Sequence, residues 1–250
     1  MNGTLYLVPN LLGVAPPESA LPARTLEVAR SLRHWRVETP KAARAFLKTL
    51  GLDVPIASLD VEAIPESATA AACEALLAPA RAGEDVGVLS DAGCPGVADP
   101  GAALVAAAHA ARLRVVPLVG PSALLLALMA SGMNGQRFAF HGYLPVKPGA
   151  RLAALRALEQ DSRSQRRAEL FIETPYRNVV MLQALAAALA PSTEVCVAVD
   201  LTQAGETIER RTSRAWRDAD LARFDKRPAV FILQAQHGPG VTGPRSPASP

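Results

Sequence analysis

The chain has 250 residues, of which 50% are hydrophobic and only 4% are aromatic. This length allows one large domain or two domains of about 100–150 residues. The low aromatic content predicts a core made mainly of alanine, leucine and valine. The formal net charge of +3 is compatible with a polyanionic partner but is too small to indicate one.

Cysteine and histidine usage argues against metal or disulfide chemistry. Cys73, Cys94 and Cys196 lie far apart and form no C-x-x-C pair, which predicts neither a zinc site nor a disulfide framework and indicates a reducing, cytoplasmic setting. The four histidines are scattered, so no metal is expected. The apolar run Val115–Ser131 is interrupted by prolines and a glycine and is too short to span a membrane. No signal peptide is expected, since the first residues lead directly into a predicted strand.

The N-terminal half is predicted to alternate strands and helices, because short apolar runs are followed by segments with one apolar face. The expected strands are Leu5–Val8, Arg36–Glu38, Val86–Leu89 and Val115–Val119. The expected helices are Thr25–His34, a segment from Thr39-Pro40 to Gly51, Ala70–Arg81, and a helix that starts at Asp99-Pro100 with Asp99 as N-cap. This alternation is typical of a mostly parallel sheet with helices on both faces.

The C-terminal half is also predicted to contain strands and helices, and its last three predicted strands follow one another without a predicted helix between them. The expected strands are Phe138–Phe140, Leu170–Ile172, Val195–Val199, Thr207–Arg211 and Ala229–Leu233. The expected helices are Ala123–Ala130, Arg151–Arg167 and a segment after Thr174-Pro175, with a loop at His141–Ala150. The fold class is therefore α/β with two α/β domains, at residues 1–119 and 120–235, and a disordered tail at 236–250. A cleft between two such domains is an expected ligand site.

The stretch from Val86 to Ala123 is the most informative part of the chain. Two β-branched runs each end in a small-residue loop, S-D-A-G-C-P-G-V-A-D-P-G after the first and V-G-P-S-A after the second. Loops that follow the strands of an open α/β sheet form its ligand site, and the glycines let a ligand lie against bare backbone. The alternative is a pair of tight turns without a ligand. Neither a G-x-G-x-x-G nor a P-loop motif occurs, so neither of those nucleotide sites is supported.

These two loops, with V-V-P-L-V before the second, resemble the paired signature of the tetrapyrrole methylase superfamily. The resemblance is nearest to its branch of small-subunit rRNA 2′-O-methyltransferases. Four further segments are similar, namely L-Y-L-V-P at Leu5–Pro9, V-E-T at Val37–Thr39, F-A-F-H-G-Y-L-P at Phe138–Pro145 and F-I-E-T-P-Y-R-N at Phe171–Asn178. The resemblance implies two α/β domains with S-adenosylmethionine in the cleft between them. It also implies a homodimer and an rRNA substrate methylated at a ribose 2′-oxygen.

The same resemblance implies a set of cofactor-binding residues. In the first domain these are Pro9, Asn10, Asp91, Ala92, Gly93, Val97 and Ala98. The linker between the domains contributes Ser122 and Ala123, and the second domain contributes Ile172, Glu173, Leu201, Pro228 and Ala229.

The acceptor side departs from the rRNA branch. Where that branch has E-D-T-R, this chain has Glu38-Thr39-Pro40-Lys41, and the Arg and Lys expected near Asp200-Leu201-Thr202 are missing. Two other functions stay open for this reason. One is methylation of a small molecule such as a tetrapyrrole, and the other is a cofactor-binding relic or interaction module without catalysis.

Two carboxylates are predicted to act on the acceptor, because a hydroxyl acceptor benefits from a base and both lie at the ends of predicted strands. They are Glu38 and Glu173. Each has a structural alternative, an ion pair with Arg36 or Lys41 for Glu38 and a favourable place at a helix start for Glu173. Asp91 either accepts a hydrogen bond from the cofactor or caps its own turn.

Two arginine clusters, at 163–167 and 210–223, predict either solvated faces or polyanion contacts. Cys94 is predicted to be a small packing residue rather than a nucleophile. His141, near the linker, is a weaker candidate to face the substrate.

Overall fold

The computed structural model of the protein describes residues 2–236, so all but the first residue of the predicted disordered tail lies outside the described residues. Its contacts divide the chain into two compact units. Unit 1 comprises residues 1–126 and 201–204, and unit 2 comprises residues 127–200 and 205–250. The division falls within helix α6 (Ala123–Ser131), a few residues after the boundary that the sequence suggests.

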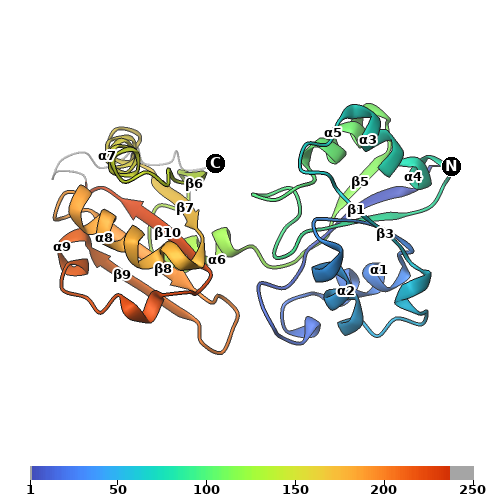
Figure 1. Cartoon of the computed structure of the whole chain (residues 1–250), viewed down its shortest axis with the longest axis horizontal. Coiled ribbons are helices and arrows are strands. Elements are labelled where there is room, and N and C mark those ends of the chain that lie inside the picture. The colour runs from blue at the N-terminus through green and yellow to red at the C-terminus, as the bar shows by residue number, and fades with distance from the viewer. Residues whose placement is uncertain (1, 237–250) are drawn as a thin grey trace, which may run out of the picture. The chain divides into compact units, whose positions relative to one another are not determined.

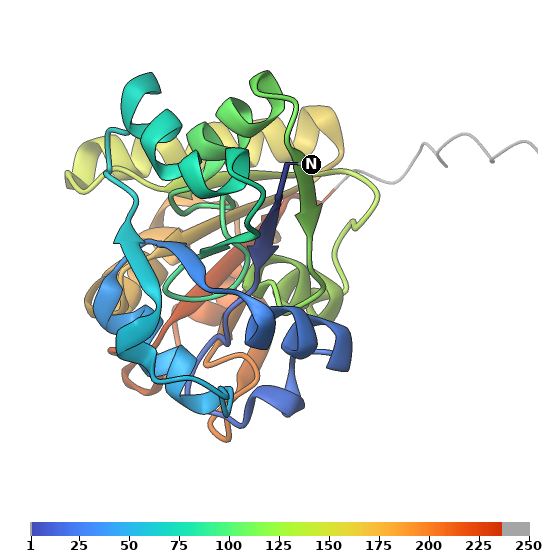
Figure 2. The same cartoon turned by 90° about the vertical axis from the view of Figure 1, so that its right-hand side faces the viewer.

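Unit 1 is a five-stranded parallel sheet in the order β3-β2-β4-β1-β5. Its strands are β1 (Thr4–Val8), β2 (His34–Val37), β3 (Asp60–Ala63), β4 (Val86–Leu89) and β5 (Arg114–Pro117). Its helices are α1 (Ala23–Ser31), α2 (Pro40–Thr49), α3 (Ala70–Leu76), α4 (Ala78–Arg81) and α5 (Ala102–Ala110). Helices α1 and α2 lie on one face of the sheet and α3, α4 and α5 on the other (Figures 1 and 2). The prediction of a parallel sheet covered on both faces is confirmed for this unit.

The strand order creates a switch point between β2 and β4. The chain leaves β2 toward β3 on one side and leaves β4 toward β5, past β1, on the other. The connections after these two neighbouring strands therefore run apart at the carboxyl edge of the sheet. Open α/β sheets bind their ligands at such a point.

Besides shifts of a few residues at the ends of elements, for example at α1, which ends at Ser31 instead of His34, three details of unit 1 differ from the sequence-based expectation. Asp99 is not an N-cap, because the Pro100 carbonyl accepts a hydrogen bond from the Gly96 N–H at 3.2 Å, which closes a turn before α5 begins at Ala102. The helix expected at Ala70–Arg81 is divided into α3 and α4, with Pro79 in the first turn of α4. Strand β3 was not predicted, since its half-exposed D-V-E-A sequence carries little apolar signal.

Unit 2 is a mixed sheet in the order β6-β7-β10-β8-β9, in which only the β6–β7 pair is parallel. Its strands are β6 (Phe138–Tyr143), β7 (Ala168–Glu173), β8 (Glu194–Val199), β9 (Thr207–Thr212) and β10 (Ala229–Gln234). Its helices, besides the end of α6, are α7 (Pro148–Gln165), α8 (Asn178–Ala188) and α9 (Ser213–Trp216). The loop predicted at His141–Ala150 is wrong at both ends, because β6 continues through a bulge at Gly142, which has φ +63°, and α7 starts at Pro148.

The core of unit 2 contains the aromatic side chains of Phe171, Trp216, Phe224 and Phe231. Phe171 of β7 stacks on Phe231 of β10 with ring centroids 5.3 Å apart. Trp216 is fully buried, and its Nε1–H donates to the Val195 carbonyl at 3.1 Å. Aliphatic side chains of α7 and α8 pack against the same face of the sheet.

Candidate functional site

The loops after β1 and β4 are joined to each other beside the switch point of unit 1. Asn10, which follows β1, donates its backbone N–H to the Gly93 carbonyl at 2.8 Å. The side-chain Nδ2 of Asn10 donates to the carbonyls of Ser90 and Asp91, each at 3.0 Å. Asn10 is 6% exposed, and its amide group satisfies the carbonyl of Ser90, a residue that is itself buried. One side chain thus fixes the shape of the β4 loop.

The loop after β2 is held against the same place by carboxylates. The Glu38 side chain accepts a hydrogen bond from the Asp91 N–H at 2.8 Å. The Asp91 carboxylate in turn accepts from the Thr39 N–H at 3.1 Å and from the Thr39 hydroxyl at 2.9 Å. Thr39 also caps α2 by accepting from the Ala42 N–H. The cap-plus-proline start predicted for α2 is confirmed, and it connects the helix to the β4 loop.

Asp99 is the site residue that sequence reasoning missed. Burial, the nearby Glu38 charge and the Asp91 charge raise the pKa of the Asp99 carboxyl to about 6, and a hydrogen bond from Ser90 opposes part of this shift. Three carboxyl groups therefore meet at the carboxyl edge of the sheet. A carboxylate with a strongly perturbed pKa in a ligand crevice is a candidate acid or base. The sequence carries one signal for this residue, a second aspartate eight residues after Asp91, but an aspartate directly before a proline also predicts a helix N-cap.

A pocket of about 360 Å³ opens beside these loops, and all of its lining residues belong to unit 1. Its volume lies within the range of about 300–1,000 Å³ found for small-molecule sites. One wall is the loop after β1, at residues 10–15, and another is α2. Asp91 and Ala92 of the β4 loop complete the lining.

Most of the predicted cofactor residues of unit 1 lie along these loops. Gly93 has φ +68° and Ala98 has φ +65°, so both residues have a left-handed backbone conformation. Pro9 is buried at the start of the first loop, whereas the Val97 side chain is 47% exposed. Ser122 and Ala123 lie at the start of α6, and the Ser122 carbonyl accepts from the Leu126 N–H at 3.0 Å.

The predicted residues of unit 2 lie where β7, β10 and β8 are neighbours. Ile172 and Glu173 at the end of β7 pair with Val230 and Ala229 of β10. Pro228 accepts a hydrogen bond from the Asp200 N–H at 3.1 Å. Leu201, the next residue, is 6% exposed and is grouped with unit 1.

The two predicted catalytic carboxylates have different surroundings. Glu38 does not pair with Arg36, because Arg36 is buried and its NH1 contacts the Asp60 carboxylate at 3.0 Å. Glu173 is 4% exposed and forms an ion pair with Arg177 at 2.7 Å. Glu38 thus belongs to the hydrogen bonds that join the loops after β2 and β4, whereas the charge of Glu173 is compensated by Arg177.

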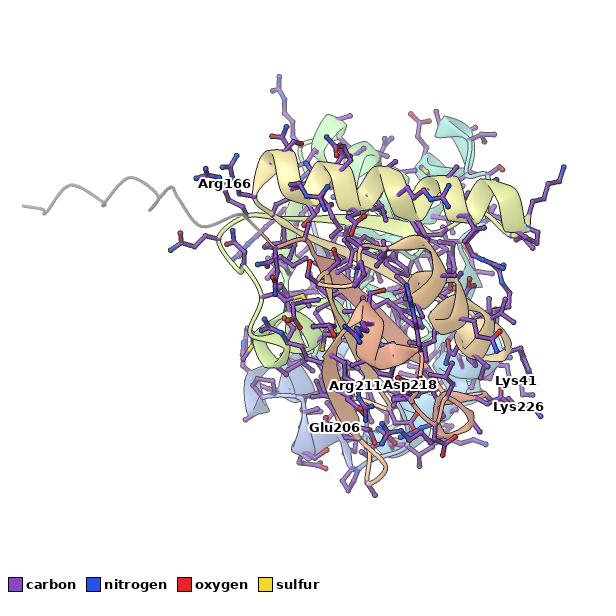
Figure 3. The ribbon with its side chains drawn as sticks, turned by 90° about the vertical axis from the view of Figure 1, so that its left-hand side faces the viewer. Lys41, Arg166, Glu206, Arg211, Asp218 and Lys226 are labelled. Carbon is purple, nitrogen blue, oxygen red and sulfur yellow. The ribbon has the colours of Figure 1, made fainter. Side chains whose placement is uncertain are left out.

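Most of the arginines in the two predicted clusters are paired with carboxylates. Arg167 contacts Glu169 at 2.7 Å, and Arg210 contacts Glu194 at 3.3 Å. Arg211 and Arg223 both contact Glu209. Arg166, at the C-terminal end of α7, is exposed (Figure 3). Because most of these arginines already pair with carboxylates of the protein, the contacts favour a structural role for them over binding of a polyanion.

The remaining candidates are held by contacts within their own units. Cys94 contacts the Pro121 carbonyl, and burial together with the Asp99 charge raises the pKa of its thiol, which favours packing over nucleophilic attack. His141 Nε2 lies 2.6 Å from the buried Glu169 carboxylate. Within residues 2–236, no group of three His, Cys, Asp or Glu side chains is arranged to hold a metal. No described helix is long and apolar enough to cross a membrane.

The Thr39 contacts give a testable prediction. Thr39→Ala removes a helix cap and the hydroxyl that holds Asp91, so we expect a loss of about 1 kcal/mol in unfolding free energy together with weaker cofactor binding. Thr69→Ala is the matched control, because Thr69 caps α3 in the same way by accepting from the Ala72 N–H. Thermal unfolding and calorimetric titration of both variants check this. Equal cofactor affinity in the two variants would contradict the role given to the Thr39–Asp91 contact.

The fold and the site are those of a ligand-binding α/β protein, in which the glycine backbone of the β4 loop lies beside a cluster of carboxyl groups. The family model described as Tetrapyrrole (Corrin/Porphyrin) Methylases matches residues 24–215. The chain belongs to this family and is an S-adenosylmethionine-dependent methyltransferase.

Two curated relatives are similar over most of the chain, and both are called Ribosomal RNA small subunit methyltransferase I. The one from Escherichia coli O157:H7 is 34% identical over 207 residues, which are 83% of this chain and 68% of the relative. The one from Xylella fastidiosa is 34% identical over 234 residues, 94% of this chain and 81% of the relative.

Solved structures support the fold. The methyltransferase CobJ has a TM-score of 0.61 at 19% identity, covering 94% of this chain and all of that one. The uroporphyrin-III-C-methyltransferase from Thermus thermophilus has a TM-score of 0.55 at 19% identity, covering 94% of this chain and 93% of the other. The two-domain α/β fold class predicted from the sequence is confirmed.

The chemistry of the switch point fits the cofactor of this family. S-adenosylmethionine carries a sulfonium and an ammonium, and the site offers three carboxyl groups for these positive charges. Gly93, in a left-handed conformation, presents backbone without a side chain.

Proposed function

We propose that this enzyme transfers the methyl group of S-adenosylmethionine to a ribose 2′-hydroxyl of small-subunit ribosomal RNA. The observation that carries the proposal is the similarity to two relatives with that rRNA name over 83% and 94% of the chain. Such an acceptor would place the enzyme in the cytoplasm, where ribosomes are assembled.

In this proposal the cofactor supplies an activated methyl group, and the protein aligns the acceptor and accepts its proton. Alignment of two reactants is worth up to about 7–11 kcal/mol. The loops after β1 and β4 bind the cofactor through Asn10, Asp91, Ala92 and Gly93. Asp99, whose pKa is raised to about 6 by burial and by the charges of Glu38 and Asp91, is the first candidate proton acceptor. Glu38 orients the Asp91 backbone, and Glu173 stays a second candidate base.

The test is methyl transfer from labelled cofactor to small ribosomal subunits prepared from a strain that lacks the enzyme. We expect one methyl group per subunit, located by mass spectrometry at a ribose. If subunits stay unlabelled while a tetrapyrrole with free carboxylates becomes methylated, the small-molecule alternative holds. A chain that binds the cofactor but methylates neither acceptor would point to a non-catalytic role.

We also propose that the enzyme is a homodimer, as the family resemblance implies. The support is apolar surface on α6, where Leu125 is 52% and Met129 is 79% exposed. Residues four apart on a helix share one side, and exposed apolar patches mark interaction sites. The edge strand β6 adds Phe138 and Tyr143, which are also exposed.

Met129→Glu is expected to convert the dimer into a monomer, because it buries a charge in an apolar contact. Sedimentation equilibrium measures the mass, and Val180→Glu on α8, where Val180 is also exposed, is the control. If the wild-type chain is monomeric, or if Met129→Glu keeps the dimer mass, this interface is wrong.

A further inference from the structure

Helix α2 presents two different faces next to each other. Ala42, Ala45 and Thr49 line the 360 Å³ pocket together with Phe46. One position earlier, Lys41, Arg44 and Lys48 repeat the same i, i+3, i+7 spacing, so they form a second line along the helix. A row of cations therefore runs beside the pocket wall.

These three side chains differ from the arginine clusters of unit 2. Lys41, Arg44 and Lys48 are all exposed. In the part of the chain that the structure describes, none of them forms an ion pair with a carboxylate. Uncompensated, parallel cations are the arrangement that binds a phosphate backbone, because each phosphate contact releases a counterion.

We infer that the pocket takes the base of the acceptor nucleotide and that Lys41, Arg44 and Lys48 bind the phosphates that flank it. This inference rests on the proposed RNA acceptor and names its binding site. The chemical class of ligand is a nucleotide in single-stranded RNA, unstacked from its neighbours.

The pocket lining suits a nucleobase. It is mostly apolar, with aliphatic side chains from the loop after β1 and the small residues Ala42 and Ala45 from α2, and enzymes hold an extruded base between apolar side chains. Phe46 reaches the pocket from the core, since it is only 4% exposed. Asp91 and Asn10 provide polar groups at its edge.

The pocket also lies next to the proposed cofactor loops. Asn10, Asp91 and Ala92 line it and are cofactor-binding candidates as well. A nucleotide in the pocket would therefore lie beside the methyl donor, as an in-line displacement requires. The alternative occupant is the cofactor itself, and the first experiment below separates the two.

The first experiment fills the pocket. Ala45→Trp places a large side chain on the pocket wall at a residue that is not a cofactor candidate. We expect kcat/KM for ribosomal subunits to fall at least about ten-fold, with the calorimetric affinity for S-adenosylmethionine unchanged. Ala106→Trp, at an exposed alanine of α5, is the control and should change neither quantity. A parallel loss of cofactor affinity in Ala45→Trp would show that the cofactor occupies the pocket and would overturn the inference.

The second experiment removes charge from α2. The double variant Arg44→Ala, Lys48→Ala is expected to bind a single-stranded RNA of the target sequence about ten-fold more weakly and to lower the salt slope of log Kd by about 1.4. Alanine is the best helix former, so α2 itself is not weakened. The control is Arg112→Ala, Arg114→Ala, which removes two exposed cations at the start of β5, the opposite edge of the sheet. If the α2 and β5 double variants lose the same RNA affinity, the assignment of Arg44 and Lys48 to the phosphates is wrong.

Failure of this inference can be distinguished from failure of the proposed function. If the wild-type chain methylates no RNA, the RNA acceptor is wrong. If the wild-type chain methylates RNA and both α2 variants behave as their controls, the acceptor stands and this binding site is wrong.

Discussion

Asp99→Asn is expected to lower the rate of methyl transfer about 10²–10⁴-fold, the usual contribution of a positioned general base. The Asp99 carboxyl, with a pKa near 6, is the candidate whose proton affinity best suits a base at neutral pH. The wild-type kcat/KM should fall below pH 6, as the carboxyl becomes protonated, and the variant should lose this dependence. Glu38→Gln and Glu173→Gln, assayed in parallel, test the other two carboxylates. Full activity in Asp99→Asn would exclude Asp99 as the base.

The same substitution should stabilise the folded protein at high pH. The folded-state pKa of about 6 lies above the ordinary aspartate value of about 3.9, so the folded chain holds this proton more tightly than the unfolded chain does. Stability therefore decreases as the pH rises from 4 to 6, and the full penalty of the ionised carboxylate is present above pH 6. Asp99→Asn removes that penalty. Its melting temperature should exceed that of the wild type at pH 8, and the difference should shrink as the pH falls from 6 toward 4.

Gly93→Ala is expected to weaken S-adenosylmethionine binding about 10- to 100-fold, because a methyl group would stand where the cofactor approaches the β4 loop. Within the protein, the nearest neighbour of that methyl group would be the Leu12 Cδ2 at 3.3 Å, a close contact that a shift of a few tenths of an ångström at the end of the leucine side chain relieves. The loss would therefore come from the ligand rather than from a clash within the fold.

Gly51→Ala is the matched control for this variant. Gly51 has φ +65° and Gly93 has φ +68°, so each alanine costs about 1–2 kcal/mol of left-handed backbone strain. A Cβ at Gly51 would meet nothing within 4 Å. Both variants should unfold at similarly lowered temperatures, and only Gly93→Ala should lose cofactor affinity in calorimetry. Unchanged affinity in Gly93→Ala would place the cofactor away from this loop.

The sequence predicted the elements of both units because their signals are local. Apolar runs bounded by glycine and proline marked β1, β4 and β5, and Thr39-Pro40 marked the start of α2. The half-polar strand β3 escaped prediction, because its place in the sheet is decided by its pairing with β2. The bulge at Gly142 likewise depends on the neighbouring strand β7.

The sequence by itself determined the alternation of strands and helices, the glycine-rich loop after β4 and the family resemblance, since each of these lies in contiguous residues. Only the tertiary structure decided that Asn10, Glu38 and Asp91 meet, because strands far apart in the chain become neighbours through the β2-β4-β1 order. It also changed the interpretation of Asp99 from a helix cap to a carboxyl group with a raised pKa. The physical reason is that burial and the charges of neighbouring residues, which set a side chain's chemistry, depend on the packing of distant segments.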